Sequence, residues 1–176
     1  MMKSRSRLRD PLQHDDLLNY QLKRLVTIGG APAIRLCEGR YGVTRSEWRL
    51  IAVLVEDGPM SPSTLSQRVH IDQARVSKII TDVIAKGLLQ RVEHPDDRRR
   101  ASVSVTLAGK QLYAELFPQL AEINRRIMAA LDKSEALALE QCLQKLTDNA
   151  QKIYDEGGGV DVRANRRRGG SRRMWT

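Results

Sequence analysis

Apolar residues recur at intervals of three or four along most of the chain, the spacing that places side chains on one face of a helix. Six stretches show this spacing, and each predicts an amphipathic helix. Two short β-rich runs, Leu88–Val92 and Ala101–Val105, lie between the fourth and fifth stretches and flank a segment rich in Pro, Asp and Arg. The pattern therefore predicts a mainly α-helical fold with a small β-hairpin. The predicted helices begin near Asp15, Thr44, Ser61, Asp72, Thr106 and Asp132.

Capping residues support several of these helix starts. Thr44–Glu47 and Asp132–Glu135 have the spacing of a capping box, in which two side chains each accept from the other's backbone N–H. Ser61 followed by Pro62 is also typical of a helix start, because proline at the first helical position loses no hydrogen bond.

Two prolines fall inside predicted helices. Pro32, at the end of Gly29–Pro32, has no backbone donor, so we expect a kink or a short break there, with the helix resuming over Ala33–Glu38. Pro118 lies within the fifth helix and predicts a kink near Glu115–Phe117.

The stretch Ser61–Thr106 has the order helix, short turn, helix, hairpin. In its second helix, a stripe of Val and Ile leaves small, polar and cationic side chains on the outside. Side chains of these types contact base edges in the major groove, usually from the first turns of a recognition helix. The alternative is an ordinary solvated face, which every amphipathic helix has. Arginines from the hairpin connection fit phosphates or a narrow minor groove. The predicted DNA contacts are Ser61, Ser63, Thr64, Gln73, Ala74, Arg75, Ser77, Lys78, Arg98, Arg99 and Arg100.

The net charge of +9 is concentrated at the two ends of the 176-residue chain. Residues 1–9 contribute +4 and residues 160–176 contribute +5, so the segment between them is neutral. The local placement of charge is therefore better evidence for a DNA partner than the overall basicity. No apolar run is long enough for a membrane span, and no apolar signal-peptide core follows the basic N-terminus, so we expect a cytoplasmic protein.

The side chains that catalysis or metal binding would need form no pattern. The three histidines have no metal-ligand spacing with each other or with the cysteines, and we find no nucleophile–base pair or phosphate-binding glycine loop. We therefore expect no enzymatic activity, no cofactor and no metal. Cys37 and Cys142 raise the alternative of a redox sensor, but both occupy helical positions where we expect buried, unreactive thiols.

The first helix and the last two carry apolar stripes that the short helix–turn–helix segment is too small to cover. A second copy of the chain is the expected partner. A two-fold dimer would place two recognition helices about one DNA turn apart, over a near-palindromic operator. The alternative is a monomer whose helices cover their own stripes.

Three motifs, taken in order, resemble the MarR family of winged-helix regulators over about residues 15–155. They are Thr44–Trp48, Lys86–Arg91 and the segment Pro95–Gly109. The resemblance implies a winged helix–turn–helix in a homodimer held by helices from both chain ends. It implies a transcription factor, usually a repressor, that is released by a small phenolic or aromatic carboxylate. It also implies that Asp97 braces the wing and that the arginines after it approach the minor groove.

Members of this family bind effectors between the dimerisation helices and the DNA-binding head, so the resemblance places a pocket beside the second helix. An arginine there would bind a carboxylate and an aromatic side chain would stack on a ring. The alternative is that the tryptophan belongs to the core and the arginines are solvated. The candidate effector-binding residues are His14, Arg40, Tyr41, Trp48 and Arg49.

The expected protein is thus a sequence-specific DNA-binding regulator, with a redox-sensing regulator and a sequence-tolerant architectural DNA-binding protein as alternatives. The expected parts are a disordered basic N-terminus (1–12), an N-terminal dimerisation helix region (13–43), a winged helix–turn–helix (44–106), C-terminal dimerisation helices (107–156) and a disordered Gly/Arg-rich tail (157–176).

Overall fold

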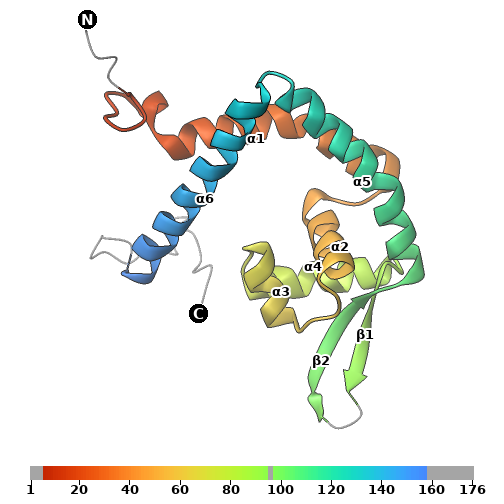
Figure 1. The fold of residues 1–176 in the computed structure, drawn as a ribbon. Coiled ribbons are helices and arrows are strands. Elements are labelled where there is room, and N and C mark those ends of the chain that lie inside the picture. The colour runs from red at the N-terminus through yellow and green to blue at the C-terminus, as the bar shows by residue number, and fades with distance from the viewer. Residues whose placement is uncertain (1–5, 95–96, 158–176) are drawn as a thin grey trace, which may run out of the picture. The chain divides into compact units, whose positions relative to one another are not determined.

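The computed structural model describes residues 6–94 and 97–157, which divide into two compact units between Trp48 and Arg49. The predicted mainly helical fold with a two-stranded hairpin is confirmed (Figure 1). Among the described residues, no helix combines the length and apolar character needed to cross a membrane. The elements are η1 (His14–Asp16), α1 (Leu18–Ile34), η2 (Arg35–Arg40), α2 (Arg45–Glu56), α3 (Pro62–Val69), α4 (Gln73–Ala85), β1 (Leu89–His94), β2 (Asp97–Val105), α5 (Leu107–Met128) and α6 (Lys133–Asp155).

The first unit contains one long helix that passes through its proline. α1 is continuous across Gly29–Pro32, so the break predicted there does not occur. Proline removes a single N–H donor, and the rest of the helical hydrogen-bond ladder is sufficient to continue α1 for two more residues. The helix then widens over η2, which has π-helical geometry, and ends before Gly42, whose φ is +64°.

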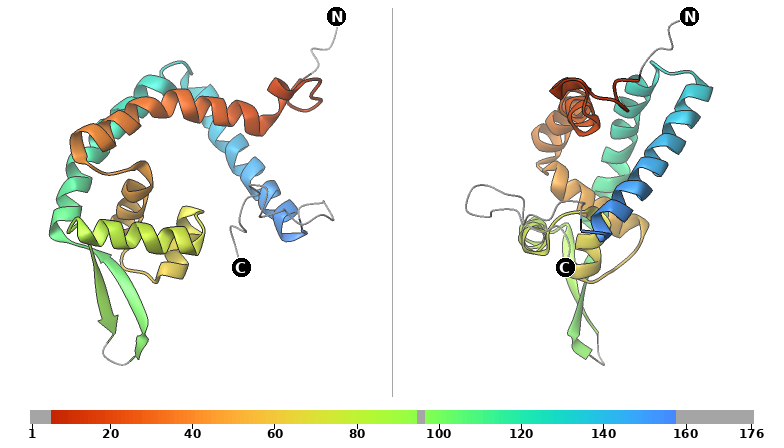
Figure 2. Two further views of the ribbon diagram at one scale, coloured as in Figure 1. Left: turned by 180° about the vertical axis from the view of Figure 1, so that it is seen from behind. Right: turned by 90° about the vertical axis from the view of Figure 1, so that its left-hand side faces the viewer.

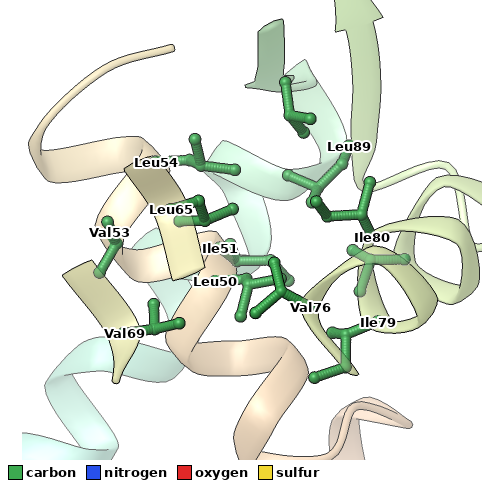
Figure 3. Close-up of a cluster of buried hydrophobic side chains, with 12 residues drawn as sticks. Leu50, Ile51, Val53, Leu54, Leu65, Val69, Val76, Ile79, Ile80 and Leu89 are labelled. Atoms are coloured by element: carbon green, nitrogen blue, oxygen red, sulfur yellow. The ribbon is translucent and has the colours of Figure 1, made fainter. Parts of the chain in front are cut away.

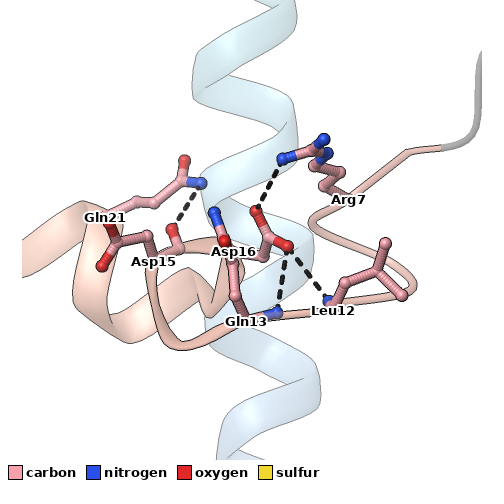
Figure 4. A network of polar contacts seen from close by, with 6 residues as sticks. All are labelled: Arg7, Leu12, Gln13, Asp15, Asp16 and Gln21. Atoms are coloured by element: carbon pink, nitrogen blue, oxygen red, sulfur yellow. Dashed lines mark hydrogen bonds and ion pairs between the residues drawn. The ribbon is translucent and has the colours of Figure 1, made fainter.

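The segment before α1 is fixed by a buried carboxylate, Asp16, which is 4% exposed. Its Oδ2 accepts from the backbone N–H of Leu12 at 3.0 Å and of Gln13 at 3.2 Å, and Arg7 Nη1 lies 3.9 Å from its Oδ1 (Figure 4). The carboxylate of Asp16 can be buried because these donors replace the hydrogen bonds that it would make to water.

The helix starts predicted at Thr44, Ser61, Asp72, Thr106 and Asp132 are confirmed by their capping hydrogen bonds, whereas α1 begins at Leu18, after Asp15, without a side-chain cap. Thr44 N–H donates to Glu47 Oε2 at 2.7 Å, and Glu47 N–H donates to Thr44 Oγ1 at 3.2 Å. Ser61, Asp72 and Thr106 each accept at their side chain from a backbone N–H in the first turn of α3, α4 and α5. α6 begins with the second capping box, Asp132–Glu135.

Residues 49–105, which we call the head, share one aliphatic core (Figure 3). Helices α2, α3 and α4 each turn their apolar stripe inward, and the first strand of the hairpin adds Leu89. Burial of these side chains, at about 25 cal/mol per Å² of apolar surface, is the main term that stabilises the head. The core residues are Leu50, Ile51, Val53, Leu54, Leu65, Val69, Val76, Ile79, Ile80, Val83, Leu89 and Val103.

The hairpin is longer than the alternation of its sequence predicted. β1 extends to His94 and β2 begins at Asp97, with Leu89 opposite Val105 and Val92 opposite Ser102. Antiparallel pairing continues through polar residues, because its backbone bonds do not require an apolar face. The hairpin projects beyond the helices of the head in every view (Figures 1 and 2).

The chain ends, within the described range, in two long helices. α5 continues through Pro118 and its axis bends along its length (Figure 1). In α6 no residue is buried, although Leu139, Leu143 and Leu146 form an apolar stripe. The stripe is therefore uncovered in the single chain.

Candidate nucleic-acid interface

The first helix of the candidate interface, α3, presents hydroxyl groups at its N-terminus. Ser61 Oγ accepts from Thr64 N–H at 3.1 Å and lies 2.9 Å from Ser63 Oγ and 2.8 Å from Thr64 Oγ1. Ser63 and Thr64 are exposed and Ser61 is half-buried. Because these hydroxyls sit at the positive end of the helix dipole, they suit contact with a phosphate.

The turn after α3 is held from two sides. Arg49, on α2, donates from Nη1 to the carbonyl oxygen of Val69 at 3.2 Å. Arg68 donates from Nε to Asp57 Oδ2 at 2.7 Å. These contacts tie the last turn of α3 to α2 and to the α2–α3 connection.

The second helix, α4, divides into a buried and an exposed face, as its sequence predicted. Asp72 Oδ1 caps it by accepting from the backbone N–H of Arg75 at 2.9 Å. The stripe from Val76 to Val83 is buried. The predicted contact residues of this helix are all exposed, and they are Gln73, Ala74, Arg75, Ser77 and Lys78. Two cations, two polar side chains and one small side chain thus share the outer surface of its first two turns.

The arginines of the hairpin lie on a strand rather than in a connecting loop. The backbone places Asp97 and Arg98–Arg100 at the start of β2, with Asp97 opposite His94. The expectation of a loop over these residues was wrong, because strand pairing extends to them. The side chains of residues 93–101 lie outside the described part, so the brace role of Asp97 and the reach of the arginines stay predictions.

The candidate effector residues make local contacts. The rings of His14 and Tyr20 meet edge to face at 4.3 Å, and the guanidinium of Arg40 lies 5.7 Å from the centre of the Tyr41 ring. Trp48 is half-buried. The division between the units separates the first four candidates from the fifth, Arg49.

An aromatic pair on α5 was missed from the sequence. Tyr113 and Phe117 stack at 5.3 Å, and the Tyr113 hydroxyl donates to Glu56 Oε1 at 2.8 Å. Burial, together with the bond to this carboxylate, raises the pKa of Tyr113. The four-residue spacing was visible in the sequence, but the partner Glu56 is 57 residues away and no local signal indicates it.

The two cysteines differ from each other. Cys37 is buried in η2 as expected, and burial raises the pKa of its thiol. Cys142 is exposed in the single chain, so the expectation of a buried thiol was wrong there. The stripe on which it lies has no cover within the described chain.

The Cys37 thiol should be unreactive in the folded protein. In a Cys142→Ser variant, we expect Ellman's reagent to label the remaining thiol only after unfolding, because the thiolate that reacts is disfavoured by burial. The Cys37→Ser variant is the control that reports on Cys142 alone. Rapid labelling of native Cys37 would contradict this and revive the redox-sensor alternative.

Residues 41–100 match the model of the MarR family. The HTH-type transcriptional repressor NicR of Pseudomonas putida is 28% identical over 117 residues, which are 66% of this chain and 71% of that protein. The homoprotocatechuate degradative operon repressor of Escherichia coli is 27% identical over 106 residues, 60% of this chain and 72% of that protein. The structure of Bordetella bronchiseptica BpsR, whose DNA binding is regulated by 6-hydroxynicotinic acid, is 25% identical with a TM-score of 0.70, and the alignment covers 78% of this chain and 98% of that one.

The matched segment contains α2, α3, α4, β1 and the start of β2, which are the elements of the candidate interface. The fold of BpsR is similar to that of this chain over the same elements and beyond them. Over residues 41–100 the chain is thus similar to the MarR family, and its fold is similar to that of BpsR.

Proposed function

We propose that this protein is a homodimeric, sequence-specific DNA-binding repressor that is released from its operator by a small aromatic acid. The exposed face of α4 carries the proposal. Arg75 and Lys78 lie one turn apart on the outside of a helix that is capped by Asp72 and anchored by a buried stripe. Such a helix can enter a major groove without unfolding, and its cations and amide can bond base edges.

The uncovered apolar faces support pairing with a second copy. α1 and α6 contain no buried residue, and Leu25 and Ile28 on α1 are 57% and 66% exposed. Stripes of this kind on long helices are unusual on a monomer surface and are typical of an interface. A two-fold axis would give each α4 a partner on the opposite half-site.

The substitution Leu143→Glu should dissociate the dimer. A carboxylate on the stripe of α6 would be buried without a partner in each subunit, so we expect the dimer dissociation constant to rise by at least about 100-fold. Sedimentation velocity over a concentration series measures it. Gln141→Glu, which adds the same charge about 160° around the helix, should leave the mass unchanged. A wild-type mass of one chain at all concentrations would rule out pairing.

The class of effector is proposed from relatives. DNA binding by BpsR is regulated by 6-hydroxynicotinic acid, and the Escherichia coli relative is named for a homoprotocatechuate operon. Both names concern aromatic acids. A thermal-shift screen against such acids, followed by gel shift on the DNA upstream of the protein's own gene, tests both parts of the proposal. An acid that raises the melting temperature and releases the DNA is the expected result.

The competing function is sequence-tolerant DNA binding driven by the basic C-terminus, which carries six arginines in residues 160–176. Deleting residues 160–176 separates the two functions. We expect operator binding to survive, with non-specific affinity lowered and a shallower salt dependence, because the deletion removes phosphate contacts only. Anisotropy titrations with operator and shuffled DNA measure both. Loss of all binding would favour the architectural function.

A further inference from the structure

The turn between α3 and α4 leaves the carbonyl of Val69 outside its own bonding pattern. Ile71 N–H donates to Ser66 O at 3.2 Å and His70 N–H donates to Gln67 O at 3.3 Å, with His70 in the left-handed conformation at φ 53°. This is the Schellman arrangement, and it accounts for two of the last carbonyls of α3. The carbonyl of Val69, the last residue of the helix, is not part of it.

Arg49 supplies the donor for that carbonyl from another helix. It lies on α2, 20 residues earlier in the chain, and its Nη1 reaches Val69 O at 3.2 Å in a partly buried contact. A cation is favoured at this position, because the C-terminus of a helix carries partial negative charge. The neighbouring pair Arg68–Asp57 is solvent-exposed, and exposed pairs contribute little. Arg49 is exposed as well, but its acceptor is the carbonyl of Val69, a buried member of the core of the head.

We propose that Arg49 is a positioning residue for DNA recognition, which holds the end of α3 and thereby sets the direction in which α4 leaves the turn. This inference rests on the proposed DNA-binding function. Only residues 70–72 separate Val69 from the first residue of α4, so a shift at Val69 reaches the recognition face without an intervening element. Base contacts carry the sequence information and phosphate contacts do not, so a displaced α4 should lose operator affinity more than affinity for shuffled DNA.

The test uses Arg49→Met, which keeps an unbranched apolar side chain but removes every donor, and Arg49→Lys, which restores a donor and the charge. Lys110→Met removes the same charge from an exposed position on α5. The full-length variants are compared by hydrogen exchange at Ile71 N–H and by titration with operator and shuffled DNA over a salt series.

For Arg49→Met we expect exchange at Ile71 to speed up about fivefold, the effect of losing one net hydrogen bond. Operator affinity should fall roughly five- to tenfold, while affinity for shuffled DNA and the salt slope stay at wild-type values. Arg49→Lys should recover most of both losses, and Lys110→Met should change neither.

Three results would overturn the inference. Equal losses on operator and shuffled DNA, with a salt slope reduced by about one, would make Arg49 a phosphate contact. Unchanged hydrogen exchange at Ile71 and unchanged operator affinity would show that the bond from Arg49 to Val69 does not position α4. A changed response to an aromatic acid, with DNA binding intact, would return Arg49 to the effector site. If the wild type binds no operator while Ile71 still exchanges faster in Arg49→Met, the proposed function fails and the brace on the turn remains.

Discussion

Replacing Gly109 with alanine should lower the free energy of unfolding by about 1–3 kcal/mol, because the added methyl group overpacks a rigid site. A Cβ at this position would collide with the carbonyl oxygen of Leu88 and would lie 2.6 Å from Val105 Cγ2. The first of these neighbours is backbone and cannot rotate away. Inside a helix, a change from glycine to alanine ordinarily raises the free energy of unfolding by up to about 1 kcal/mol. The sign of the measured change therefore distinguishes overpacking from helix propensity.

The reason for this contact lies in the junction between the head and α5. Thr106 Oγ1 donates to the carbonyl oxygen of Gly87 at 2.7 Å, and Thr106 N–H donates to Leu88 O at 3.0 Å. The same hydroxyl accepts from Gly109 N–H at 3.1 Å. The first turn of α5 is thus fastened to the chain that leaves α4, and a side chain at Gly109 would push the two apart.

Urea unfolding followed by circular dichroism measures the effect on stability. Gly39→Ala is the matched control, because nothing lies within 4 Å of a Cβ built there and its φ is not in the left-handed region. We expect that control to be neutral or slightly stabilising. An unchanged or raised midpoint for Gly109→Ala would show that the junction yields at little cost.

Local chemistry explains which features the sequence could predict. Helix starts at Thr44, Ser61, Asp72 and Asp132 were predictable because a cap and its partner N–H lie within three residues. The buried stripe of α4 was predictable because one period describes it. The same period also identified the exposed residues of α4 that belong to the candidate interface.

Contacts between distant residues explain the rest. The bond from Arg49 to Val69 and the close approach of Gly109 to Leu88 join segments about 20 residues apart, and neither end has a pattern that reveals the other. The length of the hairpin was underestimated because backbone pairing does not need alternating side chains. Exposure of Cys142 could not be read from a stripe, since a stripe predicts burial without saying in which chain.

The double substitution Arg75→Ala and Lys78→Ala should abolish specific binding while leaving the fold intact. Each contact with a base edge is worth roughly 1–3 kcal/mol, so the two together should weaken operator binding by about 10³-fold. Both side chains are exposed, and the cap of α4 uses the backbone rather than the side chain of Arg75. The melting temperature should therefore stay within a degree or two of the wild-type value.

Salt dependence separates base contacts from phosphate contacts in this experiment. If Arg75 and Lys78 read bases, affinity for shuffled DNA should change little, and alanine at each position should relax selectivity at one base pair of the operator.

Arg99→Ala, by contrast, should weaken binding and flatten its salt slope, since the hairpin is expected to contact phosphates or the minor groove. Lys110→Ala is the control for loss of one exposed charge. A footprinted operator that the double variant and Arg99→Ala still bind as tightly as the wild type would show that neither α4 nor the hairpin is the reading surface.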